Sequence, residues 1–143
     1  MLTRRSMVAG ALASMTTGLL VLRNAFAQSA DDHKGFISQA FAMRRQAVSE
    51  GDQAYGAIVV KNGRVVGLGP SRVVTNTDAT AHAEMEALRD AGRTLGTHDL
   101  SGCILYTTSP PCRMCETAAH WGNIERVYTG ADVTDRGKPG YGC

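Results

Sequence analysis

The spacing of apolar residues changes along the chain and separates predicted helices from predicted strands. Over residues 34–49 the apolar positions recur at helical spacing, and Gly51 follows them, which predicts a helix that ends there. The apolar run 55–60 is followed by a polar turn at 61–64 and a second apolar run at 64–68, a pattern typical of a β-hairpin. The remaining chain predicts a polar loop over 70–80, a helix over 82–91 closed by Gly92, a strand over 103–108, a helix ending near Gly122 and a strand over 125–130.

The predicted order of elements is helix, hairpin, helix, strand, helix, strand, which places the chain in the α/β class. Strand-helix-strand units with short connections normally form right-handed parallel crossovers, so successive helices begin at one edge of the sheet. We therefore expect the helix that begins at His82 and the helix near Cys112 to start close together in space, although the two residues are 30 positions apart.

The first 27 residues have the pattern of an export signal rather than of a folded element. Arg4 and Arg5 precede an uncharged, mostly apolar run over residues 7–22, and small residues stand just before Gln28. This pattern predicts a twin-arginine-type signal peptide over 1–27, cleavage before Gln28 and a periplasmic location. The alternative is an uncleaved membrane anchor, for which a run of 16 residues falls short of the usual span of about 20.

The remaining 116 residues, 28–143, are enough for one domain with a single core. The signal holds three of the 15 Lys and Arg residues and no acidic residue, so the domain has 12 basic against 13 acidic side chains, and its formal charge falls from +2 to −1. A domain that binds RNA normally carries a basic excess that neutralises phosphates. The charge therefore favours a small-molecule partner over a nucleic acid.

Two short motifs, His-Ala-Glu and then Pro-Cys-Arg-Met-Cys, hold the chemistry of the domain. Imidazole nitrogen and thiolate sulfur are ligands that zinc prefers, and a catalytic zinc site has three protein ligands with the fourth position left to water. The motifs supply such a set, with His82, Cys112 and Cys115 as ligands and Glu84 as an unliganded carboxylate. The sequence therefore predicts a catalytic zinc site.

A redox-active Cys-x-x-Cys pair is the alternative interpretation of Cys112 and Cys115, because disulfides form in an oxidising export compartment. With Pro111 at the first helical position, both thiols would lie at a helix start, where the dipole lowers their pKa; this favours a reactive dithiol and a metal-binding thiolate alike. The redox interpretation leaves His82 and Glu84 unexplained. Taken alone, Glu84 would be an exposed acid at a helix start, and it can reach a metal beside His82 only in an irregular first turn.

Several segments together resemble the cytidine deaminase-like superfamily, and within it the branch of guanine deaminases and tRNA adenosine deaminases. They are 80–84, 103–107, 111–115, the pair Gly56-Ala57 and Trp121. Zinc deaminases share the His-x-Glu and Pro-Cys-x-x-Cys signature. The resemblance implies a three-layer α-β-α fold around a central mixed sheet of about five strands.

The resemblance also implies the reaction, which is that of a CMP/dCMP-type deaminase. Such a hydrolase replaces the exocyclic amine of a free nucleobase or nucleoside by oxygen and releases ammonia, with Zn²⁺ as cofactor. Glu84 would be the catalytic residue that moves protons, and His82, Cys112 and Cys115 would hold the metal. A homodimer is implied as well. The side chains expected to contact the base are Ser71, Ala57, Ala83 and Trp121.

Three departures from the family pattern leave the substrate open. Pro110 stands where relatives usually have Glu, and Ser71 stands where they have an Asn that hydrogen-bonds the base. A serine hydroxyl lacks the paired donor and acceptor groups of an amide. The sequence ends at Cys143, within a region from which guanine deaminases draw recognition residues. Guanine is therefore not predicted, and a truncated or degenerate domain stays an alternative.

Two alternative functions stay open. The segment 80–84 also resembles tRNA adenosine deaminases, which predicts an RNA-editing enzyme, although the slightly acidic domain and the export signal oppose it. A non-hydrolytic periplasmic zinc or thiol-redox protein would share the cysteines and the location.

The remaining aromatic, histidine and cysteine residues receive structural interpretations. Tyr55 is expected in the core, and Trp121 is expected either in the core or stacked on the base. The other expectations are an inert buried thiol at Cys103, and exposed or capping histidines at His33, His98 and His120.

Overall fold

The structure, a computed structural model, describes residues 30–141. The predicted signal segment 1–27, its cleavage point at Gln28 and the terminal Cys143 lie outside the described residues. The elements follow one another as α1 (Ala30–Ser49), β1 (Gly56–Lys61), β2 (Arg64–Pro70), α2 (Ala83–Leu95), β3 (Cys103–Thr107), α3 (Arg113–Trp121), β4 (Arg126–Thr129) and β5 (Thr134–Asp135). Within residues 30–141, no helix combines the length and apolarity needed to cross a bilayer.

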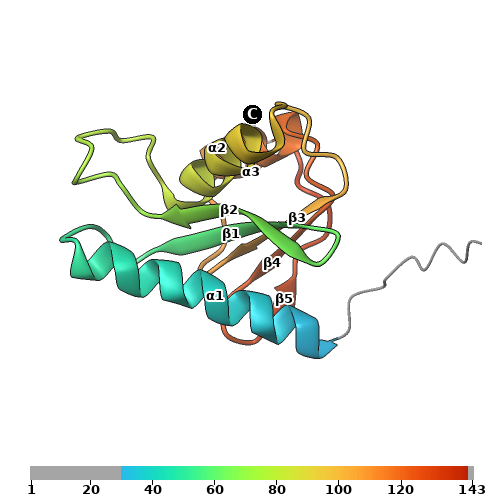
Figure 1. The fold of residues 1–143 in the computed structure, drawn as a ribbon, viewed down its shortest axis with the longest axis horizontal. Helices are drawn as coiled ribbons and strands as arrows, with labels where there is room; N and C mark the ends of the chain where they lie inside the picture. The colour runs from blue at the N-terminus through green and yellow to red at the C-terminus, as the bar shows by residue number, and fades with distance from the viewer. Residues whose placement is uncertain (1–29, 142–143) are drawn as a thin grey trace, which may run out of the picture.

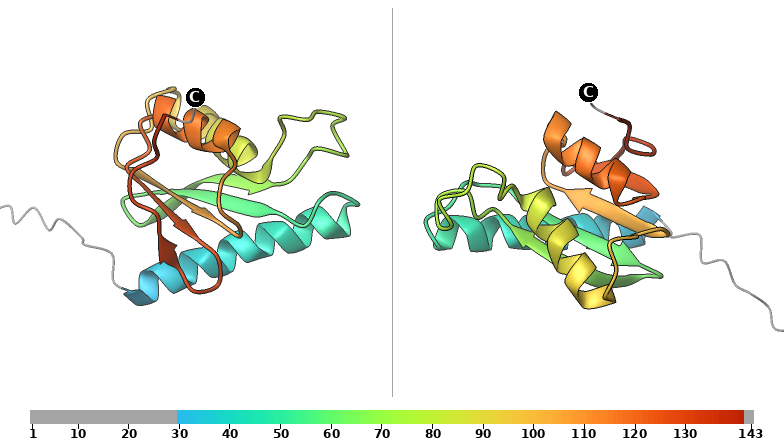
Figure 2. Two further views of the ribbon diagram at one scale, coloured as in Figure 1. Left: turned by 180° about the vertical axis from the view of Figure 1, so that it is seen from behind. Right: turned by 90° about the horizontal axis from the view of Figure 1, so that it is seen from above.

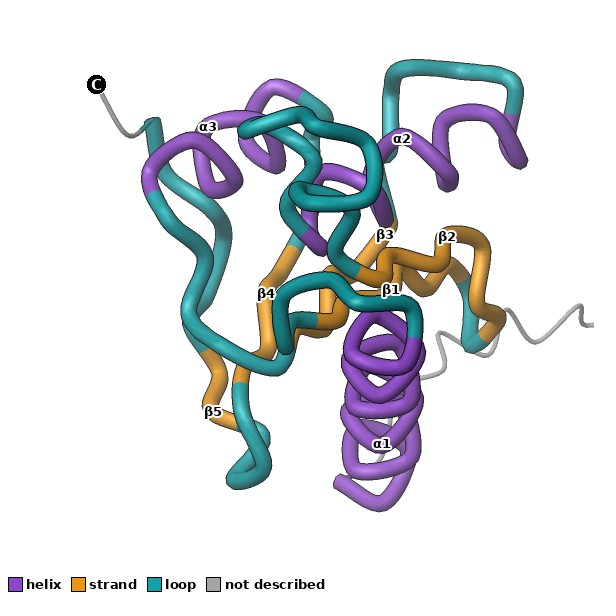
Figure 3. Tube along the Cα trace, turned by 90° about the vertical axis from the view of Figure 1, so that its left-hand side faces the viewer, coloured by secondary structure: helices purple, strands orange, loops and turns teal. Residues whose placement is uncertain are grey.

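The strands form one mixed sheet in the order β2-β1-β3-β4-β5. β3 and β4 are parallel, whereas β1 is antiparallel to both of its neighbours and β5 is antiparallel to β4. α1 covers one face of the sheet, and α2 and α3 cover the other, as Figures 1 and 2 show. The sheet seen nearly edge-on in Figure 3 separates the two helix layers. The predicted three-layer α-β-α fold with about five strands is confirmed.

β1 is an interior strand that is buried on both faces, which explains its continuous run of apolar residues. Ala57 and Val59 belong to the core cluster beneath α2 and α3, whereas Ile58 and Val60 pack with Ile37 of α1. Successive side chains of a strand point to opposite faces, so β1 joins the two cores.

Two glycines of β2 bring α2 close to the sheet. A Cβ atom at Gly67 would overlap the Ala87 carbonyl, and one at Gly69 would overlap the Ala83 carbonyl. Because glycine has no side chain, the backbone of α2 lies directly on β2. This close packing fixes the first turn of α2, immediately after His82.

The predicted end of α2 is wrong. The helix continues through Gly92 to Leu95, and Gly96 ends it in the left-handed conformation with a φ of 66°. The backbone N–H of Gly96 donates to the Arg93 and Gly92 carbonyls. A glycine at this capping position adopts a positive φ at no steric cost, whereas an interior glycine is tolerated when the helix packs well.

The predicted start of α3 is also corrected. The helix begins at Arg113, and Cys112 is its N-cap residue, in an extended conformation with φ −72° and ψ 169°. Pro111 therefore precedes the cap and is not the first helical residue. The two cysteines consequently lie on an extended residue and in the first helical turn, rather than both within the helix.

The two ends of the described chain also differ from the prediction. α1 begins at Ala30, four residues before the predicted start, and its polar first turn contains Asp31 and Asp32, which the helix dipole stabilises. β5 has two exposed residues and no apolar pattern, so apolar spacing alone predicted four strands.

Candidate active site

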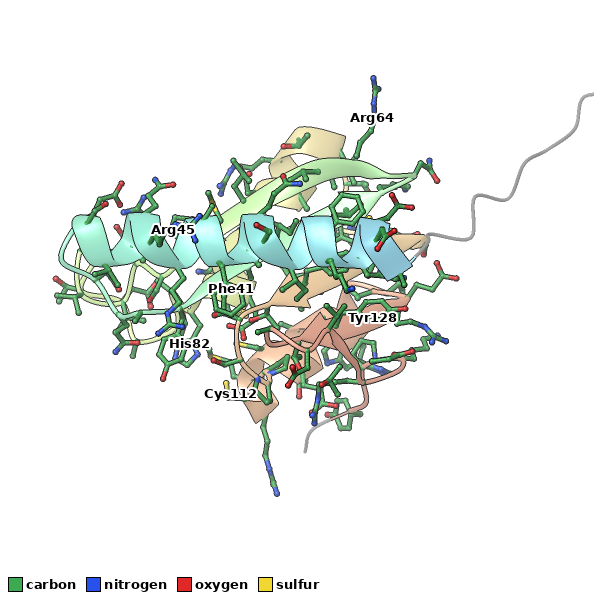
Figure 4. All side chains as sticks on the ribbon, turned by 90° about the horizontal axis from the view of Figure 1, so that it is seen from below. Phe41, Arg45, Arg64, His82, Cys112 and Tyr128 are labelled. Atoms are coloured by element: carbon green, nitrogen blue, oxygen red, sulfur yellow. The ribbon has the colours of Figure 1, made fainter. Side chains whose placement is uncertain are left out.

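His82, Cys112 and Cys115 come together at the edge of the sheet where α2 and α3 begin. The Cys112 and Cys115 Sγ atoms are 3.6 Å apart. His82 Nδ1 lies 3.7 Å from Cys112 Sγ and 3.6 Å from Cys115 Sγ. Figure 4 shows the His82 and Cys112 side chains on the same side of the molecule, clear of Tyr128 and the far end of α1.

The helix starts produce this arrangement. His82 is the N-cap of α2 with φ −61° and ψ 155°, and Cys112 is the extended N-cap of α3. Neither side chain makes a capping hydrogen bond to its own helix, so both are available to a ligand. β2 and β3 run in the same direction, since both are antiparallel to β1. The two helices therefore begin at one sheet edge, as the crossover argument predicts.

The three donor atoms fit zinc. With Zn–S of about 2.3 Å and Zn–N of about 2.0 Å, tetrahedral coordination separates two sulfurs by about 3.8 Å, and a sulfur and a nitrogen by about 3.5 Å. The distances among His82, Cys112 and Cys115 range from 3.6 to 3.7 Å. Two sulfur donors with one imidazole form a ligand set that zinc favours over magnesium or calcium, and it leaves one position open.

Cys115 is fully buried, and its environment disfavours a bare thiolate. Burial raises the pKa of the Cys115 thiol, and the neighbouring Glu84 carboxylate raises it further. The sequence-based expectation that the helix start lowers this pKa is therefore wrong for Cys115 in the protein alone. A metal cation bound at the three donors reverses the local electrostatics, because a coordinating thiol is deprotonated.

Glu84 is buried, with 7% of its surface exposed, so it is not a solvated acid at a helix start. Its Oε1 accepts a hydrogen bond from Thr107 Oγ1 at 2.9 Å, and its Oε2 lies 3.6 Å from Cys115 Sγ. His82, Cys112 and Cys115 form the metal-binding group. Glu84 reaches this group because the backbone of His82 is extended, so the two side chains are not turned apart as they would be two positions apart in a regular helix.

A cavity of about 350 Å³ opens beside the metal-binding group. Its volume lies within the range of about 300 to 1,000 Å³ that is typical of small-molecule sites. The lining residues come from the loop before β1, the start of α2 and the loop before α3: Gln53, Tyr55, His82, Ala83, Glu84, Ser109, Pro110 and Cys112. Ala83 is the one predicted base-contacting residue among them.

The other three predicted base-contacting residues lie elsewhere. Ser71 is fully buried, and its hydroxyl donates to Asp52 Oδ1 at 2.9 Å. Ala57 is fully buried in the core beneath α2 and α3. Trp121 is 68% exposed and lines a separate hollow with Leu88 and Leu100. None of these three residues lines this cavity, and their contact with a base stays a prediction.

Tyr55 lies in the cavity lining rather than in the core. It was expected in the core, but it is 48% exposed and lines the cavity. Tyr55 stands just before β1 and escapes the burial of that strand. Gln53 and Ser109 also line the cavity, although they carry no metal-binding or apolar signal in the sequence. Their positions next to strand ends are the one sequence feature that could have found them.

Asp52 holds in place the loop that carries Gln53 and Tyr55. The carboxylate accepts hydrogen bonds from the backbone N–H groups of Gln53, Val74 and Thr75 and from the hydroxyls of Ser71 and Thr75. Burial alone would raise the pKa of Asp52, but these hydrogen bonds outweigh it and hold the pKa well below its usual value. A charged Asp52 thus ties the loop before β1 to the loop after β2.

The remaining sequence predictions concern one cysteine and three histidines, and they are confirmed in part. Cys103 is a fully buried thiol as expected, and burial raises its pKa. His98 is exposed as expected. His33 is instead partly buried, and its Nδ1 lies 2.8 Å from the Tyr106 hydroxyl. His120 is also partly buried, with Nδ1 3.2 Å from the Pro139 carbonyl oxygen.

Comparison with known proteins agrees with this geometry. Residues 30–131 match the family model described as the cytidine and deoxycytidylate deaminase zinc-binding region. The chain belongs to this deaminase family. Its predicted placement in the branch of guanine deaminases and tRNA adenosine deaminases is confirmed by the relatives it matches.

The guanine deaminase of Bacillus subtilis is 37% identical over 111 residues, which cover 77% of this chain and 71% of that protein. The tRNA-specific adenosine deaminase of Aquifex aeolicus is 40% identical over 96 residues, covering 67% of this chain and 64% of the relative. An X-ray structure of the Bacillus subtilis guanine deaminase superposes with a TM-score of 0.67 at 38% identity, covering 69% of this chain and 64% of that one. The zinc cofactor and the class of hydrolases acting on C–N bonds are those of the deaminase family.

Proposed function

We propose that this protein is a zinc-dependent hydrolase that deaminates a free nucleobase or nucleoside and releases ammonia. The observation that carries the proposal is the buried Glu84 carboxylate, which lies against the metal-binding group and lines a cavity of small-molecule size. His82, Cys112 and Cys115 would hold the zinc. When bound, the zinc would activate a water molecule as the attacking nucleophile.

Glu84 performs the proton transfers in this proposal. Its Oε1 is held by Thr107, so Oε2 is the oxygen that takes a proton from the attacking water. The water oxygen bonds to the ring carbon that carries the amine, and Glu84 delivers the proton to the adjacent ring nitrogen. Glu84 then takes the second proton from the oxygen that is now bonded to the ring carbon and delivers it to the amine. The C–N bond then breaks, its electron pair leaves with nitrogen as ammonia, and the ring keeps a carbonyl oxygen.

RNA editing is the second candidate, and the similarity to the Aquifex aeolicus tRNA-specific adenosine deaminase favours it. Two features support a free base or nucleoside instead. The chain from residue 28 has a formal charge of −1 without a basic excess, and the cavity of about 350 Å³ matches a small molecule. A thiol-redox role is less well supported, because His82 Nδ1 lies within 3.7 Å of both sulfurs and a dithiol needs no such third donor.

Zinc analysis with an ammonia-release assay tests the proposal. The panel contains cytosine, adenine, guanine and their nucleosides, together with a tRNA anticodon stem-loop. We expect one zinc per chain and ammonia from at least one base or nucleoside. Ammonia from the stem-loop alone would establish the editing enzyme, and zinc without ammonia from any substrate would overturn the deaminase proposal.

We also propose that the domain is exported to the periplasm after folding with its zinc. The paired arginines Arg4 and Arg5 support this route, and metal-bound thiolates would resist oxidation outside the cytoplasm. Fractionation of cells that express the full chain should place the processed protein in the periplasm. A mainly cytoplasmic, unprocessed protein would contradict the proposal.

A homodimer is proposed on the surface around Trp121. Trp121 and Tyr141 are 68% and 58% exposed, and their rings contact one another with centroids 5.9 Å apart. Exposed aromatic clusters are typical of protein interfaces. Light scattering should give twice the chain mass, and Trp121→Lys should shift it towards the monomer. A monomeric wild-type protein at micromolar concentration would exclude the assembly.

A further inference from the structure

We infer that Gln53 is a specificity-determining residue of the cavity and that its side-chain amide binds the polar edge of the substrate ring. The inference rests on the proposed deaminase function and names the group that selects among its substrates. The polar side chains that line the cavity are Gln53, Tyr55, His82, Glu84, Ser109 and Cys112.

Most of these groups already have a task. His82 and Cys112 belong to the metal-binding group. Glu84 is held through Oε1 by Thr107 and faces Cys115 through Oε2. Three groups therefore remain to recognise a substrate: the Gln53 amide, the Tyr55 hydroxyl and the Ser109 hydroxyl.

Gln53 fits the chemistry of the proposed substrate best. Aminated rings with an amidine or amide edge present hydrogen-bond donors and acceptors side by side. A carboxamide carries both an acceptor oxygen and a two-donor NH₂ group in one plane, whereas a hydroxyl has one hydrogen to donate. Within residues 30–141, Gln53 is the one carboxamide that lines this cavity.

The backbone of Gln53 is fixed while its side chain stays available. Its N–H donates to Asp52 Oδ1 at 2.8 Å, and its carbonyl accepts from the Tyr55 N–H at 2.7 Å. Asp52 is in turn bound by Ser71 and Thr75. The Gln53 side chain is exposed, and its amide makes no hydrogen bond to another described residue. A polar group on a fixed backbone position loses little backbone freedom when it binds a ligand.

Ser71 makes contacts within the protein that support the segment before β1. Its hydroxyl donates its one hydrogen to Asp52, and its backbone N–H donates to the Tyr55 carbonyl at 3.2 Å. Ser71 thereby supports the segment that carries Gln53. In this proposal the ring edge is recognised by Gln53, which stands three residues before β1.

Gln53→Met tests the inference, because Met keeps the length of the side chain and removes both polar groups. The matched control is Gln39→Met on the exposed side of α1. We expect Gln53→Met to lower kcat/KM for the preferred substrate roughly ten- to a hundredfold, the effect of losing two hydrogen bonds, mainly through KM. The ranking of the base and nucleoside panel should also flatten, while zinc content and Tm stay at wild-type values. An unchanged ranking with unchanged KM would overturn the inference.

Binding separates this inference from the proposed reaction. Calorimetry measures the binding of each panel base to the zinc-loaded protein and to zinc-loaded Gln53→Met. If the wild-type protein binds a base but releases no ammonia, the proposed reaction fails, and a roughly tenfold or greater loss of affinity in Gln53→Met still supports the role of Gln53. Equal affinities of the two proteins, or no binding by either, would overturn that role.

Discussion

The Thr107 hydroxyl donates a hydrogen bond to Glu84 Oε1 at 2.9 Å, and both residues are buried. This contact joins the last residue of β3 to the first turn of α2. The same hydroxyl lies 3.2 Å from the Ser109 carbonyl oxygen, which belongs to the loop that lines the cavity. One short side chain thus fixes the orientation of the carboxylate, and its other oxygen is left for the chemistry.

Replacing Thr107 by Val should therefore impair the proton transfers without removing zinc. Val preserves the shape but leaves the carboxylate without its partner, so we expect kcat to fall roughly ten- to a hundredfold, with KM little changed. Thr107→Ser keeps the hydroxyl and should restore most of the rate. Steady-state ammonia release and zinc analysis of both variants check this. Equal rates for Thr107→Val and wild type would show that the hydrogen bond has no positioning role.

Glu84→Gln should abolish turnover while the metal stays bound. The amide is nearly the size of the carboxylate but cannot accept and return a proton, and general acid–base catalysis by one side chain is worth roughly a hundred- to ten-thousandfold in rate. Zinc content, measured by elemental analysis, should equal that of the wild type. A variant that keeps more than about a tenth of the wild-type kcat would contradict the role of Glu84.

Zinc removal should destabilise the protein through Cys115. A ligand that binds the folded state alone stabilises it by about 2.7 kcal/mol when its free concentration is a hundred times Kd. A chelator should therefore lower the Tm of the wild type by several degrees and leave the Tm of Cys115→Ser unchanged. Cys103→Ala is the control, since Cys103 is equally buried but lies outside the metal-binding group. If chelation lowers the Tm of Cys115→Ser as much as that of wild type, the metal is bound elsewhere.

Asp52 gives the protein an acid-sensitive contribution to stability. Its folded-state pKa is lowered, so this contribution is fully present above the unfolded-state pKa of about 3.9 and is lost as the pH falls towards the folded-state value. Asp52→Asn should reduce the free energy of unfolding by about 2 kcal/mol at pH 7, because it weakens hydrogen bonds to a charged group. The deficit should shrink below about pH 3.9. Urea unfolding at pH 7, 5 and 3 measures it, and a deficit independent of pH would argue against a charged Asp52.

Gly69→Ala should displace the first turn of α2. The added methyl group would overlap the Ala83 carbonyl, and overpacking of this kind typically costs about 1–3 kcal/mol. Because Ala83 follows His82, we also expect weaker zinc binding. Leu68→Ala is the matched control, since Leu68 is the adjacent residue of β2 and is 49% exposed. Calorimetric Tm values and zinc competition assays distinguish the two, and equal behaviour would show that the close approach is unimportant.

The metal-binding group was predictable because its ligands stand in two short sequence motifs and short connections between elements determine where those motifs lie. His82, Cys112 and Cys115 are zinc-type ligands, and short strand-helix-strand connections place the two helix starts at one edge. The burial of β1 was also visible, since its apolar run has no polar interruption. Glu84 needed more, because its reach depends on the extended backbone of His82, and apolar spacing does not encode a dihedral angle.

The cavity-lining residues outside the metal-binding group were not predictable, for a physical reason. An apolar or aromatic residue next to a strand packs equally well against a core or against a cavity, so Tyr55 gave the same signal in either case. The contact between Ser71 and Asp52 was not predictable, because the two residues are 19 positions apart and no periodic pattern links two polar residues in different loops. Gly92 was mistaken for a helix end because the composition of a segment does not show which of two glycines adopts a positive φ.

Asp52 anchors the wall that carries Gln53 and Tyr55, whereas the metal-binding group is anchored by the starts of α2 and α3. The segment proposed to select the substrate thus differs from the segments that hold the metal ligands, and the loop after β2, which Asp52 holds, connects the two. Residues 53–55 are exposed, and none of them is a metal ligand. The fold thus offers evolution and protein engineering a short segment, residues 53–55, in which substrate preference can change while the zinc chemistry is kept.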